Sequence, residues 1–246
     1  MKLTILIPMY NEEAILPAVL PRISQMARES LSDYEILFID DGSHDASAFI
    51  VEEYAREKDP TVRVFRYAEN RGKGCAVRTG MLQAQGETIV FTDCDLAYGT
   101  EAVADLYRFM EEHPEADAAI GSRALHPAGY EGYTPLRKLV SHTYRFILRL
   151  FGLRLSDSQS GLKAFRREAA QAIFSRCEVD RFAFDFEAIM IGSALGFSFA
   201  EMPARVIENR VGGKVSLLRD SLSMLRDLTR ISRRVRKIKR EEKSKI

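Results

Sequence analysis

Asp93 and Asp95 stand one residue apart at the end of the apolar run 89–91. A continuous apolar run of this kind is typical of a buried parallel strand, and open α/β sheets bind ligands at the carboxyl ends of such strands. Mg²⁺ and Mn²⁺ prefer oxygen ligands, and often combine one or two protein carboxylates with substrate phosphates. The pair therefore predicts a divalent metal site. Acidic residues that merely end a strand or cap a helix are the structural alternative.

A second acidic strand end has the same design. Asp40 and Asp41 follow the apolar run 36–39 and precede Gly42 and Ser43. Their carboxylates suit hydrogen bonds to a nucleobase or a ribose. A turn followed by a helix cap explains the same residues without a ligand.

The first apolar run, 3–7, leads into a third polar segment. Pro8 is expected to stop the strand, and Tyr10 offers a flat face on which a base can stack. Glu12 and Glu13 follow where a helix is expected to begin. Acidic residues are also favoured at a helix N-terminus for purely electrostatic reasons.

Two basic segments complete the set of candidate groups. The glycine-rich stretch 70–78 opens a predicted helix, where backbone N–H groups together with Arg71 and Lys73 suit an anion. Its spacing is neither that of a P-loop nor that of a dinucleotide fingerprint. Arg123 ends another apolar run and can bind phosphate with two parallel hydrogen bonds or form a surface salt bridge.

The elements that must position these groups alternate regularly up to about residue 125. Apolar strand patterns cover 3–7, 35–39, 62–67, 88–92 and 116–121. Helical patterns lie between them, ending near 28, 58, 85 and 112. Strands alternating with helices of this length predict an α/β fold with a doubly wound, mostly parallel sheet.

The second half of the chain is less regular. Helical patterns occupy 167–176 and 185–195, followed by a strand-like segment at 197–200, a Gly-Gly-Lys turn at 212–214 and a basic C-terminal helix. Residues 135–155 contain no Asp or Glu and form a basic amphipathic pattern, with one face that includes Arg145 and Arg149. Such a helix lies in a membrane interface or packs on the core with its basic face in water.

Composition bounds the protein class. The 246 residues are 46% hydrophobic and carry a net charge of +1, so the whole chain lacks the strongly basic character of a nucleic-acid-binding protein. The charge is uneven: residues 226–246 contain ten Lys/Arg and three Asp/Glu, a net +7. This asymmetry predicts a domain over 1–225 and a separate basic tail over 226–246.

Location is predicted from three further features. The three cysteines are scattered and suit reduced thiols in a cytosolic protein. The N-terminus lacks a signal-peptide pattern, and no apolar stretch reaches the ~18–20 residues needed to span a bilayer. With the basic tail, these features predict a cytoplasmic protein bound peripherally to the inner face of a membrane.

Taken together, the motifs resemble the family 2 glycosyltransferases of GT-A fold, and among them the polyprenyl-phosphate sugar synthases. The resemblance runs from Leu3 to about Asp227. The motifs that carry it are Pro8-x-Tyr-Asn-Glu12, Asp40-Asp-Gly-Ser43, Asn70-Arg-Gly-Lys-Gly74, Asp93-x-Asp95, Gly121-Ser-Arg123, Asp157-Ser-Gln-Ser-Gly161 and Phe184-Asp-Phe-Glu187. The segments 69–81 and 212–215 are most similar to dolichyl-phosphate glucose synthases. The chain departs from the family at Cys94 and Ser160, and in lacking the transmembrane helices that many members carry.

The resemblance implies an inverting transfer of a sugar from a nucleotide sugar to a polyprenyl phosphate, assisted by Mg²⁺ or Mn²⁺ at Asp93 and Asp95. UDP-glucose is the favoured donor and GDP-mannose the alternative. The implied donor-binding residues are Pro8, Tyr10, Glu12, Asp40, Asp41, Lys73, Asp93 and Cys94. The implied acceptor-phosphate residues are Arg123, Arg137 and Ser141, and the implied catalytic residues are Asp95, Arg123 and Lys214.

Two other functions fit parts of the pattern. A glycosyltransferase that acts on a glycan or small-molecule hydroxyl would need a carboxylate base, for which Asp185 and Glu187 are the candidates; acids in the first turn of a helix are the structural alternative. A non-catalytic membrane or nucleic-acid binding protein would use the basic tail. We expect no nucleic-acid partner, and the sequence leaves the oligomeric state open.

Overall fold

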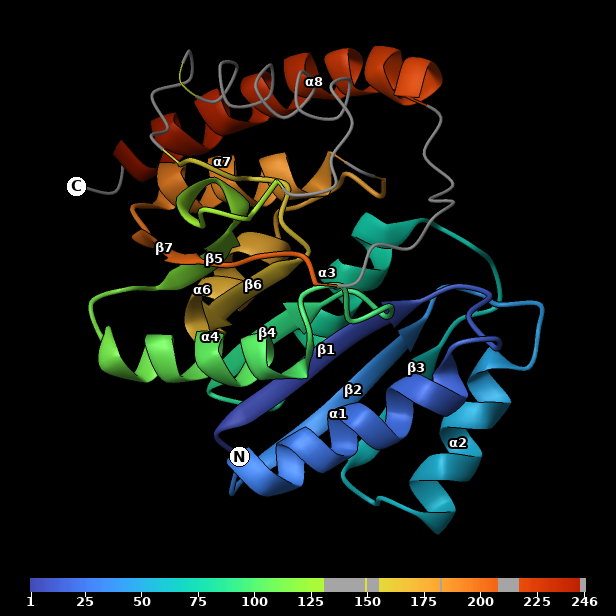
Figure 1. Ribbon diagram of the computed structural model, residues 1–246. Helices are drawn as coiled ribbons and strands as arrows, with labels where there is room; N and C mark the ends of the chain where they lie inside the picture. Colours follow the sequence, from blue (N-terminus) through green and yellow to red (C-terminus); the bar gives the residue numbers. More distant parts are fainter. Residues whose placement is uncertain (131–148, 150–154, 182, 208–216, 244–246) are drawn as a thin grey trace.

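The computed structural model describes residues 1–130, 149, 155–181, 183–207 and 217–243 (Figure 1). Its centre is one seven-stranded sheet with the order β3-β2-β1-β4-β6-β5-β7. The strands are β1 (Leu3–Met9), β2 (Tyr34–Asp40), β3 (Val62–Arg66), β4 (Thr88–Thr92), β5 (Ala118–Ser122), β6 (Leu162–Arg166) and β7 (Phe199–Pro203). The helices are α1 (Leu16–Ser30), α2 (Ser47–Glu57), α3 (Lys73–Gln83), α4 (Thr100–Glu112), α6 (Arg167–Phe174), α7 (Phe184–Leu195) and α8 (Leu217–Lys243), with a 3₁₀ turn η1 (Arg123–Leu125).

The predicted α/β fold is confirmed. β1 lies in the middle of the sheet and pairs in parallel with β2 on one side and β4 on the other. Every residue of β1 and β4 is buried, as expected for strands covered on both faces. The five strands predicted in the first half all form, so their carboxyl ends meet at one edge of the sheet.

Pro8 does not end its strand. Pairing with β4 stops at Leu6, whereas pairing with β2 continues to Met9 opposite Asp40. The prediction therefore holds on one side of β1 only. On that side, the pairing of β1 ends opposite Phe91, two residues before Asp93.

Strand β6 was not predicted. It runs antiparallel between β4 and β5, with Lys163 opposite both Phe91 and Ile120. A five-residue strand that buries a lysine and ends in arginine lacks the apolar run by which the other strands were found. This insertion separates β5 from β4 and brings the preceding loop, residues 156–161, to the carboxyl end of β4.

Helices cover both faces of the sheet. α1, α2 and α4 pack on one face, and α3, α6 and α7 pack on the other, which gives two hydrophobic cores. α8 lies outside α7, so the second face is covered by two layers of helix (Figure 1).

α8 is part of the core. Its Leu228, Ile231, Val235 and Ile238 recur every three or four residues and are buried beside α7. The predicted basic C-terminal helix forms, and the boundary predicted at residue 225 falls inside it. Within the described residues, no helix is both long and apolar enough to cross a bilayer.

Candidate active site

The acidic pair lies where β4 ends. Leu96 adopts a left-handed backbone conformation, with φ +49°, and turns the chain sharply after Asp95. Asp95 Oδ1 accepts a hydrogen bond from the Ala97 N–H at 3.2 Å, which fixes one of its oxygens. Both carboxylates remain partly exposed at the sheet edge. The turn thus presents two carboxylates to the space beyond the sheet.

These carboxylates fit a divalent cation that shares its ligands with a substrate. Asp93 Oδ1 is shielded from solvent and contacts the Lys73 ammonium. Among the described residues, no three His, Cys, Asp or Glu side chains converge as a complete metal site. Mg²⁺ is commonly held by one or two carboxylates plus substrate phosphates. Asp93 and Asp95 would therefore hold the metal together with a phosphorylated donor.

Charged side chains alternate beneath this edge. Lys73 Nζ lies 2.5 Å from Asp93 Oδ1, and Lys163 Nζ lies 2.6 Å from Asp185 Oδ1. Burial by itself would lower the pKa of Lys73, but the nearby carboxylates of Asp93, Asp185 and Asp95 outweigh burial and raise it. Burial raises the pKa of Asp185, against the effect of both lysines. The site is thus an alternating arrangement of cations and anions in a poorly hydrated place.

Four N–H groups at the N-terminus of α3 are engaged within the chain rather than left for an anion. The Gly74 and Cys75 N–H groups donate to the Asp180 carbonyl oxygen, at 2.8 and 3.3 Å. The Arg71 and Gly72 N–H groups donate to the Asp41 carboxylate, at 2.9 and 2.8 Å. The anion site predicted from the glycine-rich sequence is therefore wrong as far as these four backbone groups are concerned. The side chain of Lys73 keeps its predicted place at the site.

Asp41 holds the loop that precedes α3. Besides those two N–H groups, its carboxylate accepts hydrogen bonds from the Tyr67 hydroxyl at 2.6 Å and the Asn70 amide at 2.9 Å. Burial raises the pKa of Tyr67, and the Asp41 carboxylate raises it further. Four donors fill the acceptor capacity of a carboxylate. The contacts of Asp41 thus serve the loop.

Asp40 differs from its neighbour. Its Oδ1 accepts the Ser43 N–H at 2.9 Å, whereas its fully buried Oδ2 accepts no hydrogen bond. Arg66 Nε lies 3.3 Å from this second oxygen and supplies charge. A buried acceptor without a donor is uncommon. Asp40 therefore retains the capacity to accept a hydrogen bond from a ligand.

The loop after β1 is tied to the loop after β2. Asn11 has φ +53°, and its N–H donates to Ser43 Oγ at 2.9 Å. The Glu12 N–H donates to Ser47 Oγ at 2.8 Å. Tyr10, half-buried, stands at the start of this junction. Tyr10, Glu12 and Asp40 thus belong to one rigid corner of the sheet edge.

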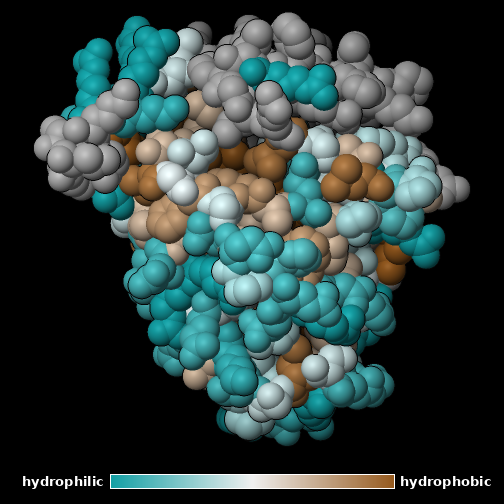
Figure 2. Space-filling view, turned by 90° about the vertical axis from the view of Figure 1, so that its left-hand side faces the viewer, coloured by the Kyte–Doolittle hydropathy of each residue, from teal (hydrophilic) through white to brown (hydrophobic). Residues whose placement is uncertain are grey.

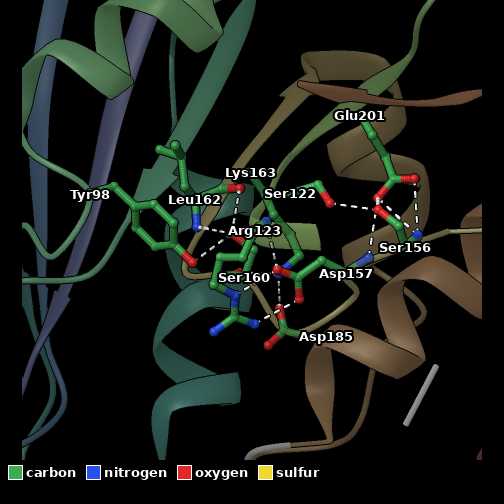
Figure 3. Close-up of polar contacts among 10 residues, drawn as sticks. All are labelled: Tyr98, Ser122, Arg123, Ser156, Asp157, Ser160, Leu162, Lys163, Asp185 and Glu201. Carbon is green, nitrogen blue, oxygen red and sulfur yellow. Dashed lines mark hydrogen bonds and ion pairs between the residues drawn. The ribbon is translucent and has the colours of Figure 1, made fainter. Parts of the chain in front are cut away.

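Arg123 takes part in a buried network rather than a surface salt bridge. Its Nε and Nη2 donate to the two oxygens of Asp157 at 2.6 and 2.7 Å (Figure 3). The side chains of Arg123 and Asp157 are only 11% and 5% exposed. Ser156, next to Asp157, bonds Glu201 Oε1 on β7 through its hydroxyl at 2.6 Å. The guanidinium is therefore fixed in place by the 156–161 loop.

The same loop touches the acidic pair. The Cα of Gly161 packs against Asp93 so closely that a Cβ there would overlap with Asp93 Oδ2. Ser160 Oγ donates to the Tyr98 hydroxyl at 3.1 Å, and the buried Lys163 ammonium donates to the Ser160 carbonyl oxygen. One loop thus connects Arg123, through Asp157, with Asp93, through Gly161.

Gly161→Ala is expected to lower metal-dependent activity by about 100-fold, because the added methyl group displaces the Asp93 carboxylate and a shift of about 1 Å at an active site can cost that much. The carboxylate can rotate, so the thermal unfolding midpoint should change little. Paired measurements of turnover and thermal unfolding check this. Wild-type turnover in the variant would show that the position of Asp93 is not critical.

Of the two predicted bases, Asp185 lies in the site and Glu187 does not. Glu187 is fully buried, and its carboxylate accepts the Val179 N–H at 2.7 Å and Arg234 Nη1 at 2.7 Å. It ties α7 to α8, and the structure does not place it among the site residues. Asp185 lies in the site but is paired with Lys163.

The other predicted site residues are either buried in the core or outside the described residues. The Cys94 side chain is buried in the hydrophobic cluster that also contains residues of α1 and α4. Arg137, Ser141 and Lys214, like most of the 135–155 segment and the 212–214 turn, lie outside the described residues. Lys163 was missed because it lies in the unpredicted strand β6. Asp157 and Gly161 belonged to a motif that was noticed, but no role was assigned to them.

Comparison with known proteins agrees with this geometry. The profile described as "Glycosyl transferase family 2" matches residues 4–174, from β1 to the end of α6. The chain belongs to glycosyl transferase family 2. The matched segment contains Asp40, Lys73, Asp93, Asp95, Arg123 and Asp157, and the enzyme is therefore a family 2 glycosyltransferase.

Among characterised members, the chain is similar to dolichyl-phosphate beta-glucosyltransferases. It is 34% identical to that of Drosophila melanogaster over 241 residues, which cover 93% of this chain and 73% of the relative. It is 31% identical to that of Homo sapiens over 239 residues, which cover 92% and 74%. The similarity thus extends beyond the family profile, across nearly the whole chain.

Solved structures share the fold. A glucosyl-3-phosphoglycerate synthase from Mycobacterium tuberculosis, in complex with Mn²⁺ and UDP-glucose, has a TM-score of 0.66 at 18% identity, covering 91% of this chain and 77% of its own. A mannosyltransferase from Pyrobaculum calidifontis, in complex with GDP-Man and Mn²⁺, has a TM-score of 0.58 at 21% identity, covering 86% and 58%. At these identities, the likeness establishes the GT-A fold alone.

Proposed function

We propose that this glycosyltransferase moves glucose from UDP-glucose to a polyprenyl phosphate. The observation that carries the proposal is the 156–161 loop, which joins Asp93 to Arg123 through Gly161 and Asp157. The loop thereby keeps Asp93, which would face the donor diphosphate, close to Arg123. The guanidinium of Arg123 is suited to binding the acceptor phosphate. The similarity to dolichyl-phosphate beta-glucosyltransferases over more than nine-tenths of the chain supports glucose and a lipid phosphate.

On the donor side, the corner formed by the β1 and β2 loops suits a nucleoside. The unfilled Oδ2 of Asp40 can accept the N–H of a pyrimidine or a purine base. Tyr10 supplies a flat face beside it. Uridine is our choice because it accompanies glucose in the related reactions, and guanosine with mannose is the alternative.

When bound, Mg²⁺ or Mn²⁺ at Asp93 and Asp95 would stabilise the negative charge that develops on the departing diphosphate. Lys73 adds a cation at the same place. The remaining work of the protein is positioning. The 156–161 loop keeps Asp93 and Arg123 in fixed relation, so that the acceptor oxygen can approach the sugar carbon from the face opposite the diphosphate.

On the acceptor side, the ion pairs that engage Asp185 and Glu187 favour a phosphate acceptor over a hydroxyl. A hydroxyl acceptor must lose a proton, whereas a phosphate monoester is largely dianionic at pH 7 and attacks without a base. Glu187 is buried against Arg234, and Asp185 is paired with Lys163. The new bond joins C1 of the sugar to a lipid-phosphate oxygen, the old bond to the diphosphate breaks, and the electron pair leaves with the nucleotide.

Arg123→Lys is expected to raise the KM for polyprenyl phosphate by tenfold or more and to leave the KM for UDP-glucose within about twofold. Lysine keeps the positive charge but lacks the planar guanidinium with its paired N–H donors. A hydrogen bond to a charged group is worth about 1.5–3 kcal/mol. Steady-state kinetics in both substrates provide the test, with the exposed Arg176→Lys as the matched control. Equal weakening of both substrates would remove Arg123 from acceptor binding.

We place the enzyme peripherally on the cytoplasmic face of an anionic membrane. The outward side of α8 exposes Arg230, Arg233, Arg236, Lys237, Lys239 and Arg240, opposite its buried apolar stripe. Figure 2 shows that hydrophobic side chains gather in the upper half of one face, toward the side on which α8 lies, while the lower half is largely hydrophilic. Basic residues near an anionic leaflet contribute about 1 kcal/mol each at best.

The triple variant Arg233→Glu, Arg236→Glu and Arg240→Glu is expected to weaken binding to anionic vesicles by on the order of 100-fold at low salt, from about 1 kcal/mol per lost basic residue. The matched control replaces three exposed basic residues with Glu in the same way: Arg28 on α1, Arg56 on α2 and Lys58 directly after α2. Vesicle sedimentation at two salt concentrations measures the effect. Equal losses in both triple variants, or equal binding to neutral vesicles, would count against α8 as the contact.

The donor assignment is tested by initial rates with polyprenyl phosphate, Mn²⁺ and a panel of UDP-glucose, UDP-galactose, UDP-N-acetylglucosamine and GDP-mannose. We expect label in the organic phase to be greatest with UDP-glucose. A greater rate with GDP-mannose would replace the proposed nucleotide and sugar while leaving the acceptor proposal intact.

A further inference from the structure

Lys73 holds one of the two proposed metal ligands. It is the first residue of α3, and its Nζ lies 2.5 Å from Asp93 Oδ1 and 5.5 Å from the centre of the Phe91 ring. Asp93 Oδ1 is itself shielded from solvent, and this ammonium supplies its counter-charge. Without the ammonium, the partly exposed Asp93 carboxylate would lose its nearest positive charge.

The backbone around Lys73 fixes where its side chain begins. Gly72 has φ +104°, a conformation that side chains disfavour, and a Cβ at Gly74 would overlap with the Val179 carbonyl oxygen. The Gly74 and Cys75 N–H groups are bound to the Asp180 carbonyl oxygen. α3 therefore starts at one defined point, and Lys73 meets Asp93 because of that geometry.

The Lys73 ammonium is paired directly with the Asp93 carboxylate. Asp185 is in turn bound by Lys163 at 2.6 Å. In the absence of a divalent cation, the carboxylate of Asp93 is thus already neutralised by a cation that belongs to the chain.

We propose that Lys73 is a resident counter-cation that competes with the divalent metal for Asp93 and is released when a nucleoside diphosphate offers it phosphate oxygens. This inference rests on the metal assignment in the proposed function. A metal without nucleotide meets a carboxylate pair in which Asp93 is already paired with Lys73. Among the described residues, that pair is also incomplete as a ligand set. A metal arriving with a diphosphate gains ligands and no longer competes with Lys73. Metal and nucleotide therefore bind cooperatively, and Lys73 is one source of that coupling.

The test measures Mn²⁺ binding directly, through the electron paramagnetic resonance signal of free Mn²⁺, with no lipid and no turnover. We compare wild type, Lys73→Met and the exposed control Lys58→Met, each alone and with UDP or GDP. Lys73→Met is expected to bind Mn²⁺ alone about tenfold more tightly than wild type, within the usual size of coupling between sites. The gain in Mn²⁺ affinity caused by the nucleotide should shrink by a similar factor, and Lys58→Met should match wild type.

A second readout uses thermal unfolding. In EDTA, Lys73→Met should unfold at a lower temperature than wild type, because Asp93 is left without its counter-charge, and saturating Mn²⁺ should restore most of the difference. Equal or weaker Mn²⁺ binding by Lys73→Met overturns the inference. If Mn²⁺ binds wild type with nucleotide but Asp95→Asn does not change that binding, the metal assignment fails instead. Failure of lipid transfer alone would leave the inference standing.

Discussion

Asp95→Asn and Asp93→Asn should each slow turnover by about 100- to 1,000-fold. A neutral amide is a poorer ligand for a hard cation, and loss of several kcal/mol of charge stabilisation corresponds to two or three powers of ten in rate. Both side chains stand at the partly exposed end of β4, outside the hydrophobic cores. The fold should therefore survive.

Turnover measured with saturating Mn²⁺ checks this, with Asp105→Asn, an exposed aspartate of α4, as the matched control. Circular dichroism should be unchanged in all three variants. Near wild-type turnover in either site variant, with Mn²⁺ present, would show that the metal does not bind there.

Arg234→Leu should destabilise the fold by about 3 kcal/mol, the lower end for removing one partner of a buried ion pair. Arg234 reaches from α8 to the fully buried Glu187 at 2.7 Å and also contacts Glu178. At this chain length, the loss corresponds to a fall of about 6–12 °C in the unfolding midpoint. The neighbouring Arg233→Leu, on the exposed side of the same helix, should stay within about 0.5 kcal/mol of wild type.

The sign of the pH dependence follows from Glu187. Burial raises the pKa of the Glu187 carboxyl to about 7, although the hydrogen bond from the Val179 N–H and the charge of Arg78 lower it. The folded protein therefore holds the carboxyl proton more tightly than the unfolded chain does. The contribution of such a group to the free energy of unfolding falls as the pH rises toward about 7. The defect of Arg234→Leu should thus be larger at pH 8 than at pH 5.5. Chemical denaturation at both values tests this, and equal defects for Arg234→Leu and Arg233→Leu would deny the tie between α7 and α8.

The strands that carry the site could be predicted because each is a continuous apolar run followed by polar residues. Asp40, Asp93 and Arg123 were found by that rule, and the sheet brings their strand ends to one edge. Strand β6 escaped because Lys163 interrupts its apolar pattern. Its lysine is tolerated in the interior because Asp185, which lies 22 residues away, pairs with it.

The roles of the charged groups could be predicted less well, because they depend on partners far away in the sequence. Asp41 is engaged by Tyr67, 26 residues later. Glu187 is paired with Arg234 across 47 residues. Each looked available for a ligand when only its neighbours in the sequence were considered. Long-range pairing decides which carboxylates serve the fold and which remain for a substrate.

The basic C-terminal segment illustrates the same limit. Its charge count predicted a separate basic tail, yet its apolar residues recur at helical spacing and pack on α7. Charge patterning describes the outward side of α8 correctly, and the buried stripe of Leu228, Ile231, Val235 and Ile238 decides where the helix lies. A deletion of this segment would remove part of the core, so substitutions on its exposed side are the informative variants.

The central claim is that the acceptor is a lipid phosphate. The most direct measurement incubates the enzyme with labelled UDP-glucose and Mn²⁺, and compares polyprenyl phosphate with the corresponding polyprenol and with a soluble saccharide. We expect label to enter the organic phase with polyprenyl phosphate alone, and to disappear with EDTA or with Asp95→Asn. Transfer of label to the polyprenol or the saccharide, with none to polyprenyl phosphate, would contradict the account.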